Sequence, residues 1–147
     1  MFSKILVCSD GSDKALEAAA VAAEMAQKFG SQVILLNVYD PSVIPAATIG
    51  IPGGLLETTV SESCYAEEIQ SGAEKSTAEV FQKAGVRYTT HRELGHPVDR
   101  IISTASDEKV DLIVIGSRGL GGFERLLLGS VSEGVLRHAH CPVLTVR

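Results

Sequence analysis

The sequence has no excess of basic residues and few cysteines. Thirteen Lys and Arg residues stand against 18 Asp and Glu residues, for a net charge of −5. This balance argues against a nucleic-acid or anionic-membrane surface, since both attract basic patches. The three cysteines, Cys8, Cys64 and Cys141, are odd in number and lack the spacing of a metal site. This number and spacing indicate free thiols in a reducing compartment and not a disulfide framework. We therefore expect a cytoplasmic protein.

The sequence also lacks a long hydrophobic run. It contains no stretch of about 18 apolar residues, the length that a membrane-spanning helix needs. The opening "MFSKILVCSDG" has no sustained apolar core before its polar turn, so we expect no signal peptide. With 147 residues, of which 45% are hydrophobic, the chain suits a single globular domain over residues 1–147.

Short apolar runs alternate with amphipathic segments along the chain. Apolar, β-branched runs are typical of strands that are covered on both faces. Helix signals stand between them: Ser12 as a first N-cap, Gly30 and Gly85 as stops, and Pro97 in a first turn. The predicted strands are residues 4–8, 32–38, 86–94, 110–116 and 142–146, and the predicted helices are residues 13–29, 60–83, 95–109 and a short helix after Ser130.

This alternation predicts an α/β fold, an open five-stranded parallel sheet with helices on both faces. In such sheets the ligand binds beyond the carboxyl ends of the strands, where the strand order reverses. The loops at those ends include "SDGSD" after the first strand, "GHPVD" after the third and "GSRGLGGFERLLLGS" after the fourth. The glycine-rich loop is therefore in the right place for a ligand.

The glycine-rich loop has the chemistry of a phosphate site. Main-chain N–H groups of glycine turns and of a helix N-terminus bind anions without cationic side chains. Ser130 is expected to cap the last helix and to donate its hydroxyl, and Ser132 adds a second hydroxyl in the first turn. The loop is not a Walker loop, because it lacks Gly-Lys-Ser or Gly-Lys-Thr, and it lacks the spacing of the dinucleotide fingerprint.

The loop also carries a resemblance. Gly116, Gly119, Gly129 and Ser130 match the pattern G-x2-G-x9-G-[ST], and the chain resembles the ATP-binding branch of the universal stress protein family. "ILVCSDGSDKALEAA" is similar to the family's opening strand and turn, "LLNV" to its second strand and "GHPVDRII" to its third turn. From "DLIVIG" to the end the similarity is nearly continuous, so it covers the chain except residues 40–57.

The resemblance implies a Rossmann-like fold of the adenine nucleotide alpha hydrolase-like type and a homodimer paired through the last strand. It implies an ATP site in which Asp10 faces the ribose and Val38 lines the adenine slot. Ile115 and Gly116 would approach the base or the ribose, and Cys8 stands where many members have Pro. The phosphates, bridged by Mg²⁺ or Mn²⁺, would be surrounded by Gly119, Gly129, Ser130, Val131 and Ser132.

Several residues keep a second interpretation. The glycine-rich loop could be a plain connection, although such connections need only a handful of residues, and Asp10 could be an ordinary turn residue. Arg118 and Arg125 are candidate phosphate ligands, but we expect them to point to solvent or to pair with Glu124 or Glu133. Residues 40–57 are apolar and long for a connection, and we expect them to cover the nucleotide or a partner subunit.

No catalytic or metal-ligating residues are predicted. His138 and His140 lie two positions apart, with no third ligand at a metal-like spacing. The chain also has no nucleophile elbow. Cys64, in a polar helix start, is the thiol that we would test for reactivity.

Three functions compete. The chain could be a nucleotide-dependent regulatory or stress-response module whose ATP-bound state an unknown protein partner reads. It could be a slow ATP-hydrolysing enzyme, since "SDGSD" distantly resembles the phosphate loop of ATP pyrophosphatases, although no general base is evident. It could also be an interaction module that binds no nucleotide, but the intact glycine pattern argues against this. We favour the regulatory module.

Overall fold

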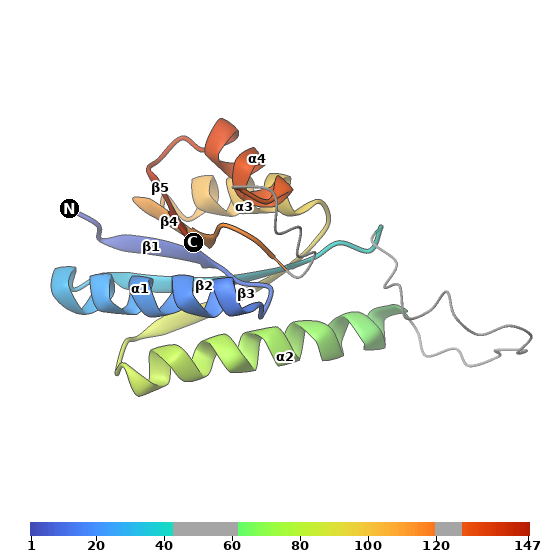
Figure 1. The fold of residues 1–147 in the computed structure, drawn as a ribbon, viewed down its shortest axis with the longest axis horizontal. Coiled ribbons are helices and arrows are strands. Elements are labelled where there is room, and N and C mark those ends of the chain that lie inside the picture. Colours follow the sequence, from blue (N-terminus) through green and yellow to red (C-terminus); the bar gives the residue numbers. More distant parts are fainter. Residues whose placement is uncertain (43–61, 120–127) are drawn as a thin grey trace, which may run out of the picture.

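The computed structural model describes residues 1–42, 62–119 and 128–147, and these form a five-stranded sheet covered by helices (Figure 1). The strand order is β3-β2-β1-β4-β5, and every pairing is parallel. In chain order the elements are β1 (Lys4–Cys8), α1 (Asp13–Phe29), β2 (Gln32–Tyr39), α2 (Glu62–Lys83), β3 (Tyr88–Leu94), α3 (Pro97–Asp107), β4 (Leu112–Gly116), α4 (Ser130–His138) and β5 (Val143–Val146). The predicted α/β architecture is confirmed, with boundaries that differ by at most two residues for most elements.

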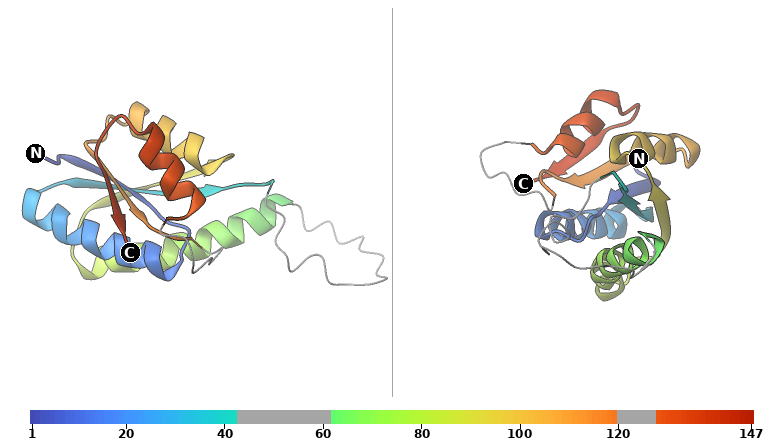
Figure 2. Two further views of the ribbon diagram at one scale, coloured as in Figure 1. Left: turned by 45° about the horizontal axis from the view of Figure 1, so that its top comes forward. Right: turned by 90° about the vertical axis from the view of Figure 1, so that its right-hand side faces the viewer.

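The sheet separates two apolar cores, because successive residues of a strand point to opposite faces. Ile5 and Val7 pack in the core beneath α1 and α2, whereas Leu6 and Cys8 pack in the core beneath α3 and α4. Figure 2 shows the two helix pairs on opposite sides of the sheet. β1 and β4 are covered on both faces and are almost continuously apolar, whereas the edge strand β3 contains only half-buried and exposed residues.

Local signals set the limits of α1. The Ser12 side chain accepts a hydrogen bond from the Ala15 amide at the N-cap, and Asp13 occupies the first turn, where the helix dipole favours an anion. Gly30 closes the helix in the left-handed region, with φ of 68°. The buried face of α1 consists of alanines at 15, 18, 19, 22, 23 and 26. These small side chains let the helix axis lie close to the sheet.

The chain changes direction across the sheet between β1 and β4. β1 pairs with β2 on one side and with β4 on the other, so β2 and β3 extend the sheet one way and β4 and β5 the other. The loops after β1 and β4 therefore leave the sheet side by side, at the carboxyl ends of these two strands, and then lead away from each other. A crevice at such a point is the usual ligand site of an open α/β sheet.

Some expectations fall outside the part of the chain that the structure describes. Most of residues 40–57 belongs to this group, as do Glu124, Arg125 and the side chain of Cys64. Of the helices that are described, none has the length and apolar character needed to cross a bilayer.

Gly116 lies at a close approach between β4 and α1. A β-carbon built on Gly116 would lie 2.8 Å from the carbonyl carbon of Lys14 and 3.0 Å from the amide nitrogen of Ala15. Both atoms belong to the helix main chain, so neither can rotate away. The packing of α1 against the end of β4 therefore depends on the absence of a side chain at position 116.

We expect Gly116→Ala to lower the free energy of unfolding by about 1–3 kcal/mol, the range for overpacking a well-packed core. Gly72→Ala is the matched control, because an added β-carbon on Gly72 in α2 meets nothing within 4 Å. There the same methyl group should stabilise the helix by about 0.5–1 kcal/mol. Urea denaturation measures both values, and equal stability of the two variants would contradict this account of the contact.

Candidate functional site

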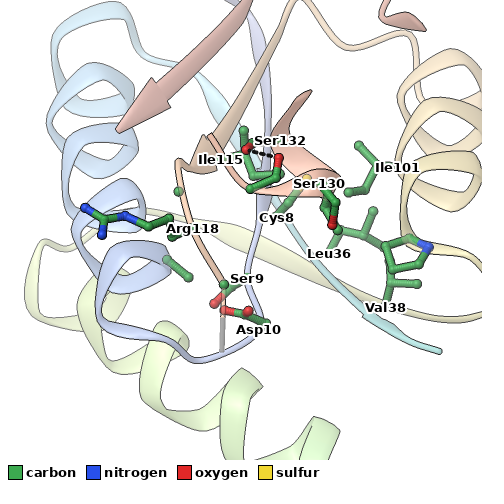
Figure 3. A pocket seen from close by; sticks show the side chains of 16 residues that line it. Cys8, Ser9, Asp10, Leu36, Val38, Ile101, Ile115, Arg118, Ser130 and Ser132 are labelled. Carbon is green, nitrogen blue, oxygen red and sulfur yellow. Dashed lines mark hydrogen bonds between the residues drawn. The ribbon is translucent and has the colours of Figure 1, made fainter. Parts of the chain in front are cut away.

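A cavity of about 540 Å³ opens at the carboxyl ends of β1, β2 and β4, beside the first turns of α3 and α4 (Figure 3). Its lining includes every residue that the sequence analysis assigned to a nucleotide: Asp10, Val38, Ile115, Gly116, Gly119, Gly129, Ser130, Val131 and Ser132. The remaining lining residues are Cys8, Ser9, Ala15, Leu36, Pro97, Ile101 and Arg118. Residues from five separate segments of the chain thus meet in one hollow.

One end of the cavity is apolar. Leu36 and Val38 of β2 face it from the sheet, and Ile101 of α3 faces it from above the sheet, as Figure 3 shows. Cys8 completes this wall with an exposed fraction of 7%, and burial raises the pKa of its thiol. The Cys8 side chain is therefore a neutral apolar group at neutral pH, as suits a slot for a flat, weakly polar ring.

Asp10 is held at the other side of the cavity by the loop after β1. The Ser12 amide donates to Oδ1 of Asp10 at 3.0 Å, which fixes the carboxylate relative to the start of α1. A β-carbon on Gly119 would lie only 2.5 Å from Oδ2 of Asp10. The loops after β1 and β4 therefore touch at this pair, and any side chain at position 119 would displace the carboxylate.

The first turn of α4 forms the polar end of the cavity. The structure corrects one expectation here: the N-cap is Gly129 and not Ser130, because the first helical hydrogen bond runs from the Glu133 amide to the Gly129 carbonyl at 2.9 Å. Gly129 has no side chain with which to cap the helix. Ser130 is instead the first helical residue, exposed and at the cavity wall. Its hydroxyl and the first-turn amides can therefore face a bound anion.

Ser132 has a different role from the one expected. Its side chain is buried, and its hydroxyl lies 3.0 Å from the Ser117 carbonyl oxygen and 2.9 Å from the Gly129 carbonyl oxygen. A hydroxyl carries one proton, so these two acceptors already compete for it. Ser132 can offer its main-chain amide to an anion, but its side chain holds the end of β4 against the start of α4.

Side-chain charge contributes little to the polar end. Arg118 lines the cavity, but in Figure 3 its side chain extends away from Ser130 and Asp10. Glu133 pairs with Arg137 at 2.7 Å across one helical turn. The attraction for an anion therefore comes mainly from the helix N-terminus and its amides.

Sequence reasoning missed three residues of the apolar end, Leu36 of β2 and the pair Pro97 and Ile101 of α3. Pro97 and Ile101 lie four positions apart on α3 and line the cavity together. The signal was present, because residues at that spacing share a face of a helix. Which sheet face α3 covers is a tertiary property, so the sequence did not show that these side chains reach the ligand site.

Comparison with known proteins agrees with this geometry. A sequence profile of the universal stress protein family matches residues 1–147. The chain belongs to the universal stress protein family. The universal stress protein MJ0531 of Methanocaldococcus jannaschii is 39% identical over 147 residues, which cover 100% of this chain and 83% of that protein.

Solved structures share the fold of this universal stress protein. The hypothetical protein MJ0577 superposes with a TM-score of 0.78 at 28% identity, covering 99% of this chain and 96% of that one. A universal stress protein in complex with cAMP superposes with a TM-score of 0.70 at 25% identity, covering 99% and 97% of the two chains. An adenine nucleotide is thus bound by one structural neighbour.

Proposed function

We propose that this universal stress protein binds ATP or a related adenine nucleotide in the cavity and acts as a nucleotide-dependent regulatory module of a stress response. The observation that carries the proposal is the combination, in one hollow, of an apolar slot and a helix start without a side-chain cap. A nucleotide has the same two parts, a flat base and a charged phosphate chain. The cAMP complex of a structural neighbour supports the base as adenine.

The base would lie against Leu36, Val38 and Ile115. β1 pairs with β2 only as far as Cys8 opposite Leu36, with a final bond from the Ser9 amide to the Leu36 carbonyl. β2 continues to Tyr39, so the main chain at Val38 extends past the end of β1. There the main chain of β2 can contact the edge of the base, while the apolar side chains cover the faces of the base.

The sugar and phosphates would occupy the polar end. A carboxylate accepts hydrogen bonds from hydroxyl groups and repels phosphate, so Asp10 suits the ribose. The phosphates would then pass Gly119 and reach Gly129, Ser130, Val131 and Ser132 at the start of α4, where the dipole favours negative charge. The Gly129 amide already donates to the Ser117 carbonyl at 2.6 Å, so the amides that could meet the phosphates are those of Ser130, Val131 and Ser132, while Gly129 adds no side chain at the helix start.

ATP would bring Mg²⁺ or Mn²⁺ to bridge its phosphates, and the ion would neutralise their charge. The described residues hold no group of three or more His, Cys, Asp or Glu side chains that could bind a metal ion. The ion would therefore be held chiefly by phosphate oxygens beside the Ser130 hydroxyl. This arrangement fits a cavity in which Arg118 extends away from the helix start.

A regulatory role fits the lining better than catalysis. Phosphoryl transfer needs a positioned nucleophile and strong charge stabilisation. Among the cavity residues that the structure describes, amides and the Ser130 hydroxyl stabilise charge, and Asp10 is the one carboxylate. We therefore expect slow hydrolysis at most, with the signal carried by nucleotide occupancy to a protein partner in the cytoplasm.

We also propose a homodimer paired through β5. This strand lies at the sheet edge, and its residues Val143–Val146 are all half-buried. The Ile113 and Ser117 amides donate to the carbonyls of Pro142 and Val146, so by alternation the main chain at Thr145 faces away from β4. Pairing with a second copy would satisfy those outward groups.

The first test is to denature freshly purified protein and identify any nucleotide that is released. We expect ATP, or ATP with ADP, at close to one molecule per chain. A protein that releases no nucleotide and then binds neither ATP with Mg²⁺ nor cAMP in calorimetry would favour the interaction module without nucleotide. Release of phosphate over time, measured separately, distinguishes storage of ATP from slow hydrolysis.

We expect Ser130→Ala to weaken ATP binding by about 10-fold to 100-fold, because a hydrogen bond to a charged group is worth about 1.5–3 kcal/mol. Ser103→Ala is the matched control, since Ser103 is also exposed on a helix and bonds only locally to the Arg100 carbonyl. Both variants should unfold at the same urea concentration as the parent. Equal ATP affinities in the two variants would place the phosphates elsewhere.

We expect Thr145→Pro to convert the dimer into a monomer of 15.5 kDa, because it removes one outward N–H group without breaking the pairing with β4. Thr90→Pro makes the same change in β3, at the other edge of the sheet. The Gly95 amide donates to the Tyr39 carbonyl of β2, so by alternation the main chain at Thr90 faces away from β2. Sedimentation velocity at micromolar concentration compares the two. A dimer that survives Thr145→Pro but not Thr90→Pro would assign the interface to β3.

A further inference from the structure

A polar cluster is buried between the end of β1, β2 and α2, and one of its members, Ser9, also lines the cavity. It consists of Ser9, Asn37 and Thr77, whose exposed fractions are 6%, 3% and 0%. Asn37 belongs to β2 and alternates with Val38, which lines the cavity, so the cluster lies between the sheet and α2. Buried polar groups reduce the stability of the fold unless they are hydrogen-bonded. The hydrogen bonds of these three residues show which segments of the chain they connect.

The bonds converge on Ser9. The Ser9 hydroxyl lies 2.7 Å from the Thr77 hydroxyl, and Thr77 in turn donates to the Ala73 carbonyl at 2.8 Å. Because the Thr77 proton goes to Ala73, Ser9 must be the donor to Thr77. The Asn37 side-chain amide donates to the Ser9 carbonyl at 2.8 Å. Ser9 is therefore held through its side chain by α2 and through its main chain by β2.

The next turn of the loop is held by the same helix. The Gly11 amide donates to the Ser9 hydroxyl at 3.2 Å. Gly11 has φ of +80°, and a β-carbon there would lie 3.0 Å from the α-carbon of Ala73. Asp10 is thus the residue between two positions that contact α2, while its own carboxylate points to Ser12 and toward Gly119.

We propose that Thr77 is a positioning residue of the nucleotide site, which acts through Ser9 to hold the Asp10 carboxylate at the ribose. Thr77 itself does not line the cavity. It orients Ser9 so that the Ser9 hydroxyl accepts from the Gly11 amide, and this fixes the turn that carries Asp10. The inference rests on the proposed function, since it assigns to α2 the control of one contact of the proposed ligand.

The test compares Thr77→Val with Thr77→Ser. Valine keeps the shape of threonine and removes the hydroxyl, whereas serine keeps the hydroxyl. Ser76→Ala is the matched control, because the Ser76 hydroxyl donates to the same Ala73 carbonyl at 3.1 Å without reaching Ser9. The ligands are ATP with Mg²⁺ and 2′,3′-dideoxy-ATP with Mg²⁺, and the measured quantity is the ratio of their dissociation constants.

We expect the parent to prefer ATP over the dideoxy compound. Thr77→Val and Asp10→Ala should each reduce that preference about fivefold to tenfold, since one hydrogen bond is worth about that factor. Thr77→Ser and Ser76→Ala should keep the preference. In the Asp10→Ala background, Thr77→Val should change the ratio no further. A parental ratio in Thr77→Val, or a full additional loss in the double variant, would overturn the inference.

A second readout needs no nucleotide. Hydrogen exchange of the Gly11 and Ser12 amides should be about fivefold to tenfold faster in Thr77→Val than in Ser76→Ala, because the turn opens more often. Unchanged exchange at both amides would overturn the positioning role even if the parent binds no nucleotide. If exchange is faster in Thr77→Val while the parent binds neither compound, the proposed function is rejected. The control of the Asp10 turn by Thr77 is then still established.

Discussion

The carbonyl oxygen of Ser117 joins the end of β4 to the start of α4. It accepts a hydrogen bond from the Gly129 amide at 2.6 Å and lies 3.0 Å from the buried Ser132 hydroxyl, so the chain that leaves the sheet after Gly116 returns to the same point. This closure brings Gly119 to the same cavity as the first turn of α4. The cavity depends on it, because its polar end is made of residues from both sides of the closed loop.

β2 connects the two faces of the sheet at the site. Val38 points into the cavity, while Asn37, one position earlier, holds the Ser9 carbonyl on the opposite face. The strand therefore contributes both to the apolar slot and to the fixation of the loop that carries Asp10. A change on the α2 side of the sheet can in this way reach a ligand on the α3 and α4 side without a contact between the two.

The site combines strong means of holding an anion with few means of transforming one. The helix start offers main-chain amides that can face an anion without a mobile side chain, and the Cys8 thiol stays neutral because burial raises its pKa. Such a site suits a protein whose output is a bound state. This agrees with membership of the universal stress protein family and with the cAMP complex of one structural neighbour.

Local patterns were enough to predict the strands and most helix limits, because apolar runs and caps such as Gly30 act over short stretches of chain. Most of the residues that meet in the cavity were predicted from the resemblance to the universal stress protein family and not from local patterns. They were not enough for contacts between distant segments. The Ser130 cap was wrong because the position of the first helical bond depends on how Gly129 docks on Ser117. Pro97 and Ile101 were missed because the side of the sheet that α3 covers is set by packing. The bond between Ser9 and Thr77 joins residues 68 positions apart.

The sequence by itself determined which segments form strands and helices, since that follows from local periodicity and caps. Only the tertiary structure decided which of their side chains share a cavity, since that follows from strand order and close packing.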